Sequence, residues 1–123
     1  MARNTILIVE DDQVVRRAME AILSAAGHRV RTADTCSSGL ALALEELPEL
    51  LVLDISLPDG TGWSLLESIH NARPHENFKV IVASSNQVTR GQLRKYRVDI
   101  FIAKPFDMAY LAESVGQLLD SIS

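Results

Sequence analysis

Three short runs of the sequence are almost wholly apolar, and they limit the folds open to this chain more than any other feature. They are residues 5–9 (Thr-Ile-Leu-Ile-Val), 50–53 (Leu-Leu-Val-Leu) and 80–83 (Val-Ile-Val-Ala). A strand with one wet face alternates polar and apolar residues, whereas a continuous apolar run is typical of a strand buried on both faces of a parallel sheet. We therefore expect these runs at the centre of a parallel sheet that helices cover on both sides.

Two further segments, residues 28–33 and 99–103, are predicted as strands at the edges of this sheet. A helical pattern follows each strand, and the weakest one, residues 88–96, has few apolar positions and contains Gly91. Five strands that alternate with five helices predict an α/β fold, a doubly wound parallel sheet with right-handed crossovers. The most apolar runs belong in the middle, which gives the flavodoxin-like strand order 2-1-3-4-5. A chain of this length is expected to form one domain, residues 1–123.

Residues that cap helices or break them mark the ends of several elements. Ser37 or Ser38 is predicted to cap the second helix, and Asp107 to cap the last one. Residues 55–62 contain proline and glycine and are expected to form a loop.

Charge and composition exclude some classes of function. Twelve basic and sixteen acidic residues give a formal charge of -4, which argues against direct binding of nucleic acid, because such binding depends on neutralising phosphates. The single cysteine, Cys36, has no partner for an internal disulfide. The apolar runs are too short to span a membrane, and the residues before the first strand leave no room for a signal peptide. We expect a cytoplasmic protein without a membrane segment.

Polar residues stand where four of the predicted strands end. Glu10 and Asp11 follow the first run, Asp54 follows 50–53, Ser84 follows 80–83, and Lys104 follows 99–103. The carboxyl ends of parallel strands lie along one edge of a sheet, so these side chains are expected to meet in one crevice. Three acids, a hydroxyl and an amine in one crevice predict phosphoryl chemistry around a divalent cation.

Each residue also has an ordinary structural explanation. The acids at positions 10 and 11 suit the first turn of a helix, where the helix dipole favours negative charge. Ser84 is an unremarkable loop residue on its own, and Phe101 on its own reads as a core residue. The combination of the acids with Lys104 is what favours a functional site.

Three motifs make the chain resemble the receiver domain of two-component response regulators over essentially its whole length. Residues 6–12 (Ile-Leu-Ile-Val-Glu-Asp-Asp) resemble the acidic turn of that family. Residues 51–62 (Leu-Val-Leu-Asp-Ile-Ser-Leu-Pro-Asp-Gly-Thr-Gly) resemble its phospho-acceptor segment, and residues 101–106 (Phe-Ile-Ala-Lys-Pro-Phe) its lysine-proline segment. The three motifs occur in the family's order and spacing.

The resemblance implies a role for each matching position. Asp54 is the implied phospho-acceptor, assisted by Ser84 and Lys104, and Ser84 and Phe101 are the implied switch residues. The implied ligands of Mg²⁺ (or Mn²⁺) are Glu10, Asp11, Asp54 and the backbone carbonyl of Ser56, and the peptide bond before Pro105 is implied to be cis.

A receiver of this kind catalyses only its own phosphorylation and dephosphorylation and is not otherwise an enzyme. The resemblance implies that a histidine kinase or histidine phosphotransfer protein supplies the phosphoryl group. It also implies that a downstream protein target or output domain reads the surface formed by the fourth helix, fifth strand and fifth helix.

Two departures from the family pattern affect these expectations. Residues 97–99 read Arg-Val-Asp, whereas many relatives have Gly-Ala before the acidic residue of the fifth strand. The sequence therefore does not determine where the fourth helix ends. Residues 108–123 contain no lysine or arginine, so dimerisation through the fourth and fifth helices has no support from the sequence.

Two other functions remain as alternatives. A pseudo-receiver would bind partners without being phosphorylated. A phosphatase of the haloacid-dehalogenase type also uses an aspartate after a buried strand, but it needs a second acid two residues later, where this chain has Ser56. The sequence leaves open whether the receiver acts alone or belongs to a longer regulator.

Overall fold

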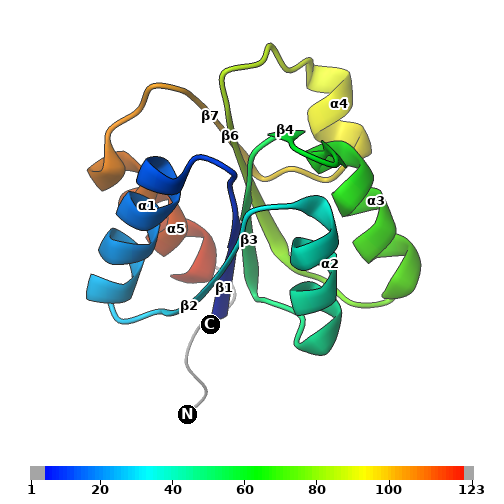
Figure 1. The fold of residues 1–123 in the computed structure, drawn as a ribbon, viewed down its shortest axis with the longest axis horizontal. Coiled ribbons are helices and arrows are strands. Elements are labelled where there is room, and N and C mark those ends of the chain that lie inside the picture. The colour runs from blue at the N-terminus through cyan, green and yellow to red at the C-terminus, as the bar shows by residue number, and fades with distance from the viewer. Residues whose placement is uncertain (1–4, 121–123) are drawn as a thin grey trace.

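A five-stranded sheet, parallel throughout, lies at the centre of the protein (Figure 1). The computed structural model describes residues 5–120. The strands of the sheet are β1 (Thr5–Val9), β2 (Arg29–Ala33), β3 (Leu50–Leu53), β6 (Lys79–Ser84) and β7 (Ile100–Ala103). Their order is β2-β1-β3-β6-β7, which confirms the predicted order 2-1-3-4-5 with its two edge strands.

Five helices cover the sheet in two layers. They are α1 (Gln13–Ala25), α2 (Cys36–Glu45), α3 (Gly62–Ala72), α4 (Arg90–Lys95) and α5 (Met108–Asp120). Figure 1 shows α1 and α5 together on one face of the sheet and α2, α3 and α4 on the other. None of the helices in residues 5–120 is long and apolar enough to cross a bilayer.

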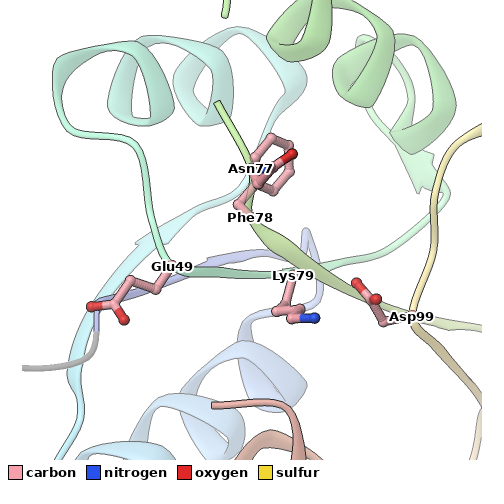
Figure 2. Close-up of a pocket in the computed structure, with 5 residues that line it drawn as sticks. All are labelled: Glu49, Asn77, Phe78, Lys79 and Asp99. Carbon is pink, nitrogen blue, oxygen red and sulfur yellow. The ribbon is translucent and has the colours of Figure 1, made fainter. Parts of the chain in front are cut away.

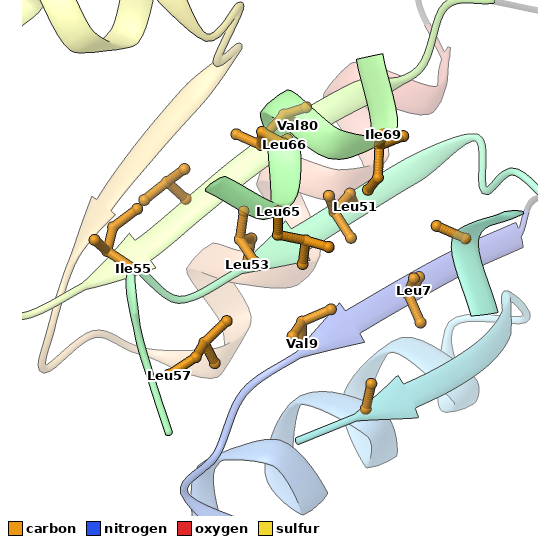
Figure 3. Packing of buried hydrophobic residues seen from close by; sticks show 13 residues of the cluster. Leu7, Val9, Leu51, Leu53, Ile55, Leu57, Leu65, Leu66, Ile69 and Val80 are labelled. Atoms are coloured by element: carbon orange, nitrogen blue, oxygen red, sulfur yellow. The ribbon is translucent and has the colours of Figure 1, made fainter. Parts of the chain in front are cut away.

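The central strands supply both hydrophobic cores. In β1, Ile6 and Ile8 pack with α1 and α5. Leu7 and Val9 pack on the other face with α2 and α3 (Figure 3). All four side chains are fully buried, as expected for a strand covered on both faces. Burying one such side chain contributes about 1.5–3 kcal/mol, so the sheet is anchored from both sides.

The connections differ from the prediction in two places. Thr35, and not Ser37 or Ser38, caps α2, because its hydroxyl accepts a hydrogen bond from the amide of Ser38 while the Ser38 hydroxyl accepts from the amide of Thr35. The expected loop over residues 55–62 contains a short antiparallel hairpin of β4 (Ser56–Leu57) and β5 (Gly60–Thr61).

Helix α4 is shorter than the predicted helix over residues 88–96. Thr89 begins it as the N-cap, and Arg97 ends it with a left-handed backbone conformation, φ 57°. The amide of Val98 donates to the carbonyl of Leu93 at 2.8 Å, which closes the helix end in the manner usual for glycine. The helix has no buried residue, in keeping with its weak apolar pattern.

Candidate functional site

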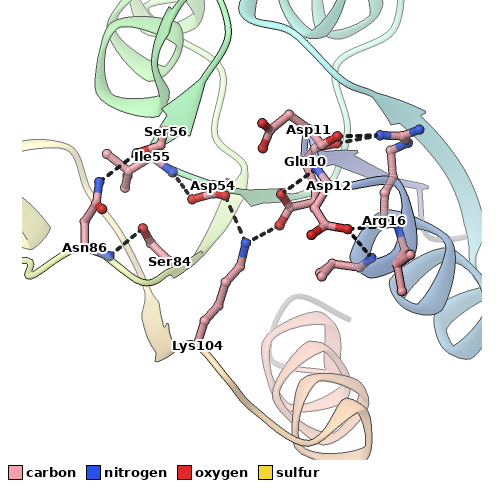
Figure 4. A network of polar contacts seen from close by, with 12 residues as sticks. Glu10, Asp11, Asp12, Arg16, Asp54, Ile55, Ser56, Ser84, Asn86 and Lys104 are labelled. Atoms are coloured by element: carbon pink, nitrogen blue, oxygen red, sulfur yellow. Dashed lines mark hydrogen bonds and ion pairs between the residues drawn. The ribbon is translucent and has the colours of Figure 1, made fainter.

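The polar residues that follow the strands meet at the carboxyl edge of the sheet (Figure 4). Carboxylate oxygens of Glu10, Asp11 and Asp54 all lie within 4.8 Å of one another. Glu10 and Asp54 are buried, with 1% and 8% of their surface exposed, and Asp11 is open to solvent. The first and third strands are neighbours in the sheet, which explains why residues more than forty positions apart come together.

Lys104 reaches into this acidic cluster from the end of β7. Its Nζ lies 2.5 Å from Oε1 of Glu10 and 2.9 Å from Oδ2 of Asp54. The peptide bond between Lys104 and Pro105 is cis. Burial by itself would lower the pKa of Lys104, but the hydrogen bonds and charges of the two carboxylates raise it above the usual lysine value.

Glu10 is the acid whose ionisation is most disturbed. Burial raises its pKa from 4.5 to about 7, and the charge of Asp54 adds to this, although hydrogen bonds from Lys104 and from the Asp12 amide act in the opposite direction. The Asp12 amide donates to Oε2 of Glu10 at 3.2 Å. A second cation in this cluster would relieve the repulsion between the carboxylates.

The carboxylate of Asp54 is held at both oxygens. Oδ1 accepts a hydrogen bond from the amide of Ile55 at 2.6 Å, and Oδ2 accepts from Lys104. The backbone of Gly62 lies close to the backbone of Asp54, since a Cβ at position 62 would lie 2.4 Å from the carbonyl oxygen of Asp54. Any larger residue at position 62 would therefore displace the strand end that carries Asp54.

Asn86 connects the two serines near Asp54. Its side-chain amide donates to Oγ of Ser56 at 2.9 Å, and its backbone amide donates to Oγ of Ser84 at 3.1 Å. Ser84 is buried and Ser56 is exposed. Phe101 lies half-buried on β7, packed against the hydrophobic core on the α2 and α3 face of the sheet.

Two residues that sequence analysis did not single out support this site. Arg16 of α1 donates a hydrogen bond to the carbonyl oxygen of Glu10 at 2.9 Å and a longer one, 3.4 Å, to that of Asp11. Asp59, at the tip of the β4–β5 hairpin, accepts hydrogen bonds from the amides of Cys36 and Ser37. These two bonds lower the pKa of Asp59 and attach the hairpin to the start of α2. Nothing in the local sequence distinguishes Arg16 from other surface charges, and Asp59, although it lies within the motif over residues 51–62, has no role implied by the resemblance.

The donor set of the cluster suits a hard divalent cation. Its candidate side-chain ligands are carboxylate oxygens alone, with no histidine or cysteine among the three grouped residues. Oxygen ligands favour Mg²⁺, Mn²⁺ or Ca²⁺ over zinc, which usually takes nitrogen or sulfur ligands. The three acids thus form a cluster of the kind that holds Mg²⁺ in receiver domains.

A hollow of about 370 Å³ lies at the amino edge of the sheet, where β3, β6 and β7 begin, whereas Asp54 follows the other end of β3 (Figure 2). Its lining residues are Glu49, Asn77, Phe78, Lys79 and Asp99. Two of its polar groups are already bonded to the backbone of β6. The carboxylate of Asp99 accepts a hydrogen bond from the amide of Val80, and the carbonyl of Glu49 accepts one from the amide of Lys79. The hollow contains none of the predicted site residues.

Comparison with known proteins assigns the family. A model described as "Response regulator receiver domain" matches residues 6–116. The KDP operon transcriptional regulatory protein KdpE of Escherichia coli K12 is 35% identical over 108 residues, which cover 86% of this chain and 47% of KdpE. The chain spans about half or less of the length of the curated relatives it matches first, from 25% to 48%.

Solved structures agree with this assignment. A CheY-like receiver domain protein from Methanospirillum hungatei JF-1 superposes with a TM-score of 0.89 at 32% identity, covering 98% of this chain and 96% of that one. The BeF3-activated DrrB receiver domain gives a TM-score of 0.82 at 26% identity, with 97% and 99% covered. The acidic pocket of Glu10, Asp11 and Asp54, with Lys104 beside it, is typical of receivers that accept phosphate. In fold, in sequence and in this pocket, the chain belongs to the response regulator receiver domain family.

Proposed function

We propose that this protein is a phosphorylation switch in which Asp54 receives a phosphoryl group from a histidine kinase or a histidine phosphotransfer protein. The observation that carries the proposal is the convergence of Lys104 and two further acids on the buried carboxylate of Asp54. A receiver domain implies a histidine kinase partner, and the family assignment supports that donor. The site residues keep the roles that the resemblance implies.

Glu10, Asp11 and Asp54 would hold Mg²⁺, or Mn²⁺, together with the backbone carbonyl of Ser56. Bound Mg²⁺ would supply positive charge that offsets the negative charge of the carboxylates and of the incoming phosphoryl group. The β4–β5 hairpin carries Ser56, and its attachments to α2 through Asp59 and to Asn86 favour a fixed position for that carbonyl.

The transfer itself needs a carboxylate oxygen that is correctly aimed. In the proposed step a carboxylate oxygen of Asp54 forms a bond to phosphorus, the P–N bond of the phosphohistidine breaks, and its electron pair returns to the imidazole nitrogen. The Ile55 amide fixes one oxygen of Asp54. Lys104 contacts the other, and it would remain close enough to bond the added phosphoryl oxygens.

The switch would act through Ser84 and Phe101. The hydroxyl of Ser84 accepts a hydrogen bond from the amide of Asn86, so its own proton is available for a phosphoryl oxygen. Movement of this hydroxyl toward the phosphoryl group would change the packing around Phe101 and the surface of α4, β7 and α5. A downstream protein or an output domain, and not nucleic acid directly, would read that surface.

The structure of a relative supports the chemistry. The DrrB receiver domain, 26% identical to this chain, is described as BeF3-activated, and beryllofluoride on a carboxylate resembles an acyl phosphate in shape and charge.

Intact-mass spectrometry tests the proposal. The protein is incubated with Mg²⁺ and acetyl phosphate, and we expect one labile phosphoryl adduct that is absent from Asp54→Asn and absent when EDTA is added. Glu76→Gln is the matched control, because Glu76 is exposed and precedes β6 at the amino edge of the sheet, opposite Asp54, so this variant should keep the adduct.

Two results would contradict the proposal. A folded wild-type protein that forms no adduct with Mg²⁺ and either acetyl phosphate or a phosphorylated kinase domain would be a pseudo-receiver. Steady release of phosphate from simple monoesters, without accumulation of an adduct, would instead identify a phosphatase of the haloacid-dehalogenase type.

A further inference from the structure

The guanidinium group of Arg16 is directed at the backbone of the acidic turn and not at a carboxylate (Figure 4). Its Nη1 donates to the carbonyl oxygens of Glu10 and Asp11, at 2.9 and 3.4 Å. Within residues 5–120 Arg16 forms no ion pair with an acid. A half-buried cation beside three carboxylates that bonds only main-chain oxygens must act mainly on the position of that main chain.

The two carbonyls belong to residues whose side chains form the acidic pocket. On its other side the turn is tied to the sheet, since the Glu10 amide donates to the carbonyl of Ala33 at 3.0 Å. It is also tied to α1, which the Asp12 carboxylate caps at the amides of Val14 and Val15. Arg16 adds a further restraint, because its side chain reaches from α1 to the carbonyls of the turn.

Asp11 depends most on these restraints. The carboxylates of Glu10 and Asp54 are held by Lys104 and by backbone amides. In the described part of the chain no hydrogen bond is found for the exposed carboxylate of Asp11, so its direction follows from the backbone that carries it. The longer of the two Arg16 bonds acts on that backbone.

We propose that Arg16 is a positioning residue for the metal pocket, which holds the carbonyls of Glu10 and Asp11 so that their carboxylates face a common cation. This inference rests on the proposed function, because it assumes that the pocket takes Mg²⁺.

The charge of Arg16 and its restraint on the acidic turn should have opposite effects on Mg²⁺ affinity. A guanidinium close to the pocket repels a divalent cation, so if charge alone mattered, removing it would strengthen Mg²⁺ binding. If Arg16 instead holds the turn, removing it lets the carboxylates spread and weakens binding. Outer residues that orient metal ligands typically change metal affinity about 10-fold to 100-fold.

Calorimetric titration with Mg²⁺ separates the two accounts. We compare the wild type with Arg16→Met and with Arg17→Met, because Arg17 is the next residue of α1, is exposed, and has no side-chain hydrogen bond or ion pair within residues 5–120. Both variants remove one positive charge from the same helix. We expect Arg16→Met to bind Mg²⁺ roughly 10-fold more weakly than the wild type, and Arg17→Met to bind it equally well or slightly better.

A second measurement needs no metal. In the metal-free protein, hydrogen exchange at the hydrogen-bonded backbone amides of Glu10 and Asp12 should be faster in Arg16→Met than in Arg17→Met, while amides in the centre of α5 stay unchanged. Arg16→Lys keeps the charge and one donor, so it is expected to fall between the wild type and Arg16→Met.

The outcomes are distinct for each hypothesis. Wild-type protein that binds no Mg²⁺ would contradict the proposed function. Wild-type protein that binds Mg²⁺, with Arg16→Met binding it as tightly as Arg17→Met or more tightly, would overturn the role of Arg16 alone. If Arg16→Met does not fold, Arg16→Lys is compared with Arg17→Lys, and equal affinities of these two variants would overturn it.

Discussion

Lys104 and Glu10 form an ion pair at 2.5 Å although they stand 94 positions apart in the sequence. The same ammonium group also contacts Asp54, so one cation bridges two of the three acids in the pocket. The side chain of Lys104 is only 16% exposed, and water screens this interaction less than it would at the surface. Lys104 therefore supplies part of the positive charge that a bound metal would supply.

Replacing Lys104 should strengthen metal binding while it impairs phosphorylation. In Lys104→Met the carboxylates lose a competing cation, and we expect Mg²⁺ affinity to rise by about 3-fold to 10-fold at pH 8.5, where Glu10 is ionised. The phosphoryl adduct should form more slowly because no ammonium group remains to bond the phosphoryl oxygens. Lys79→Met, at the opposite edge of the sheet, is the control and should change neither quantity. Weaker Mg²⁺ binding by Lys104→Met would show that Lys104 organises the acids more than it competes with the metal.

The raised pKa of Glu10 predicts pH-dependent metal binding. Protonated Glu10 is a poor ligand, and its pKa of about 7 means that protons compete with the metal near neutrality. We expect Mg²⁺ affinity to fall about 10-fold for each pH unit below 7 and to level off above about pH 8. Calorimetric titration from pH 6 to 9 measures this profile, and an affinity that is constant over that range would contradict the assigned pKa.

The same pKa has a consequence for the metal-free protein. Glu10 keeps its proton in the folded state up to about pH 7, whereas the unfolded chain releases it near 4.5. The contribution of Glu10 to the free energy of unfolding therefore decreases as the pH rises from 4.5 through 7. In urea unfolding without metal, Glu10→Gln should gain stability relative to the wild type between pH 5 and pH 8. A difference that stays constant with pH would exclude this linkage.

The sequence was sufficient to predict the sheet and the residues at its carboxyl edge. The apolar runs at residues 50–53 and 80–83 identify buried strands because they are too short for a buried helix. Once the strand order is known, Glu10 and Asp54 must be neighbours, since the strands that precede them are paired. The apolar runs and the strand order are therefore enough to predict that these two acids lie side by side.

The supporting contacts were beyond the reach of sequence analysis because they join exposed residues across elements. Arg16 and Arg17 are neighbouring arginines, and only the rotation of α1 about its axis decides which of them faces the acidic turn. Asp59 reaches α2 from a hairpin that the sequence presents as a loop. The predicted bounds of α4 were wrong for a different reason: the helix has no buried residue, so its apolar pattern is too weak to show where it begins.

The end of α4 provides a stability prediction. Arg97 adopts φ 57°, where a side chain costs about 1–2 kcal/mol and glycine costs nothing. We expect Arg97→Gly to raise the free energy of unfolding by about 0.5–1 kcal/mol, because the greater entropy of glycine in the unfolded chain offsets part of the gain. Arg94→Gly is the matched control, an exposed arginine within the same helix, and should lower stability by about 1 kcal/mol. Urea unfolding measures both, and equal signs for the two variants would contradict the argument.

The C-terminal end of α2 provides the second stability prediction. Arg31 of β2 donates hydrogen bonds to the carbonyls of Leu42 and Glu46, which end the helix, at 2.8 and 2.5 Å. Arg31→Lys keeps the charge but loses the forked geometry, so one carbonyl loses its partner, and we expect a loss of about 1–2 kcal/mol. Arg29→Lys is the control, because Arg29 pairs with the exposed carboxylate of Glu46 and such pairs contribute about 0–1 kcal/mol. A cost for Arg29→Lys equal to that of Arg31→Lys would show that the charge near α2, and not the bonds to its last carbonyls, stabilises this end of the helix.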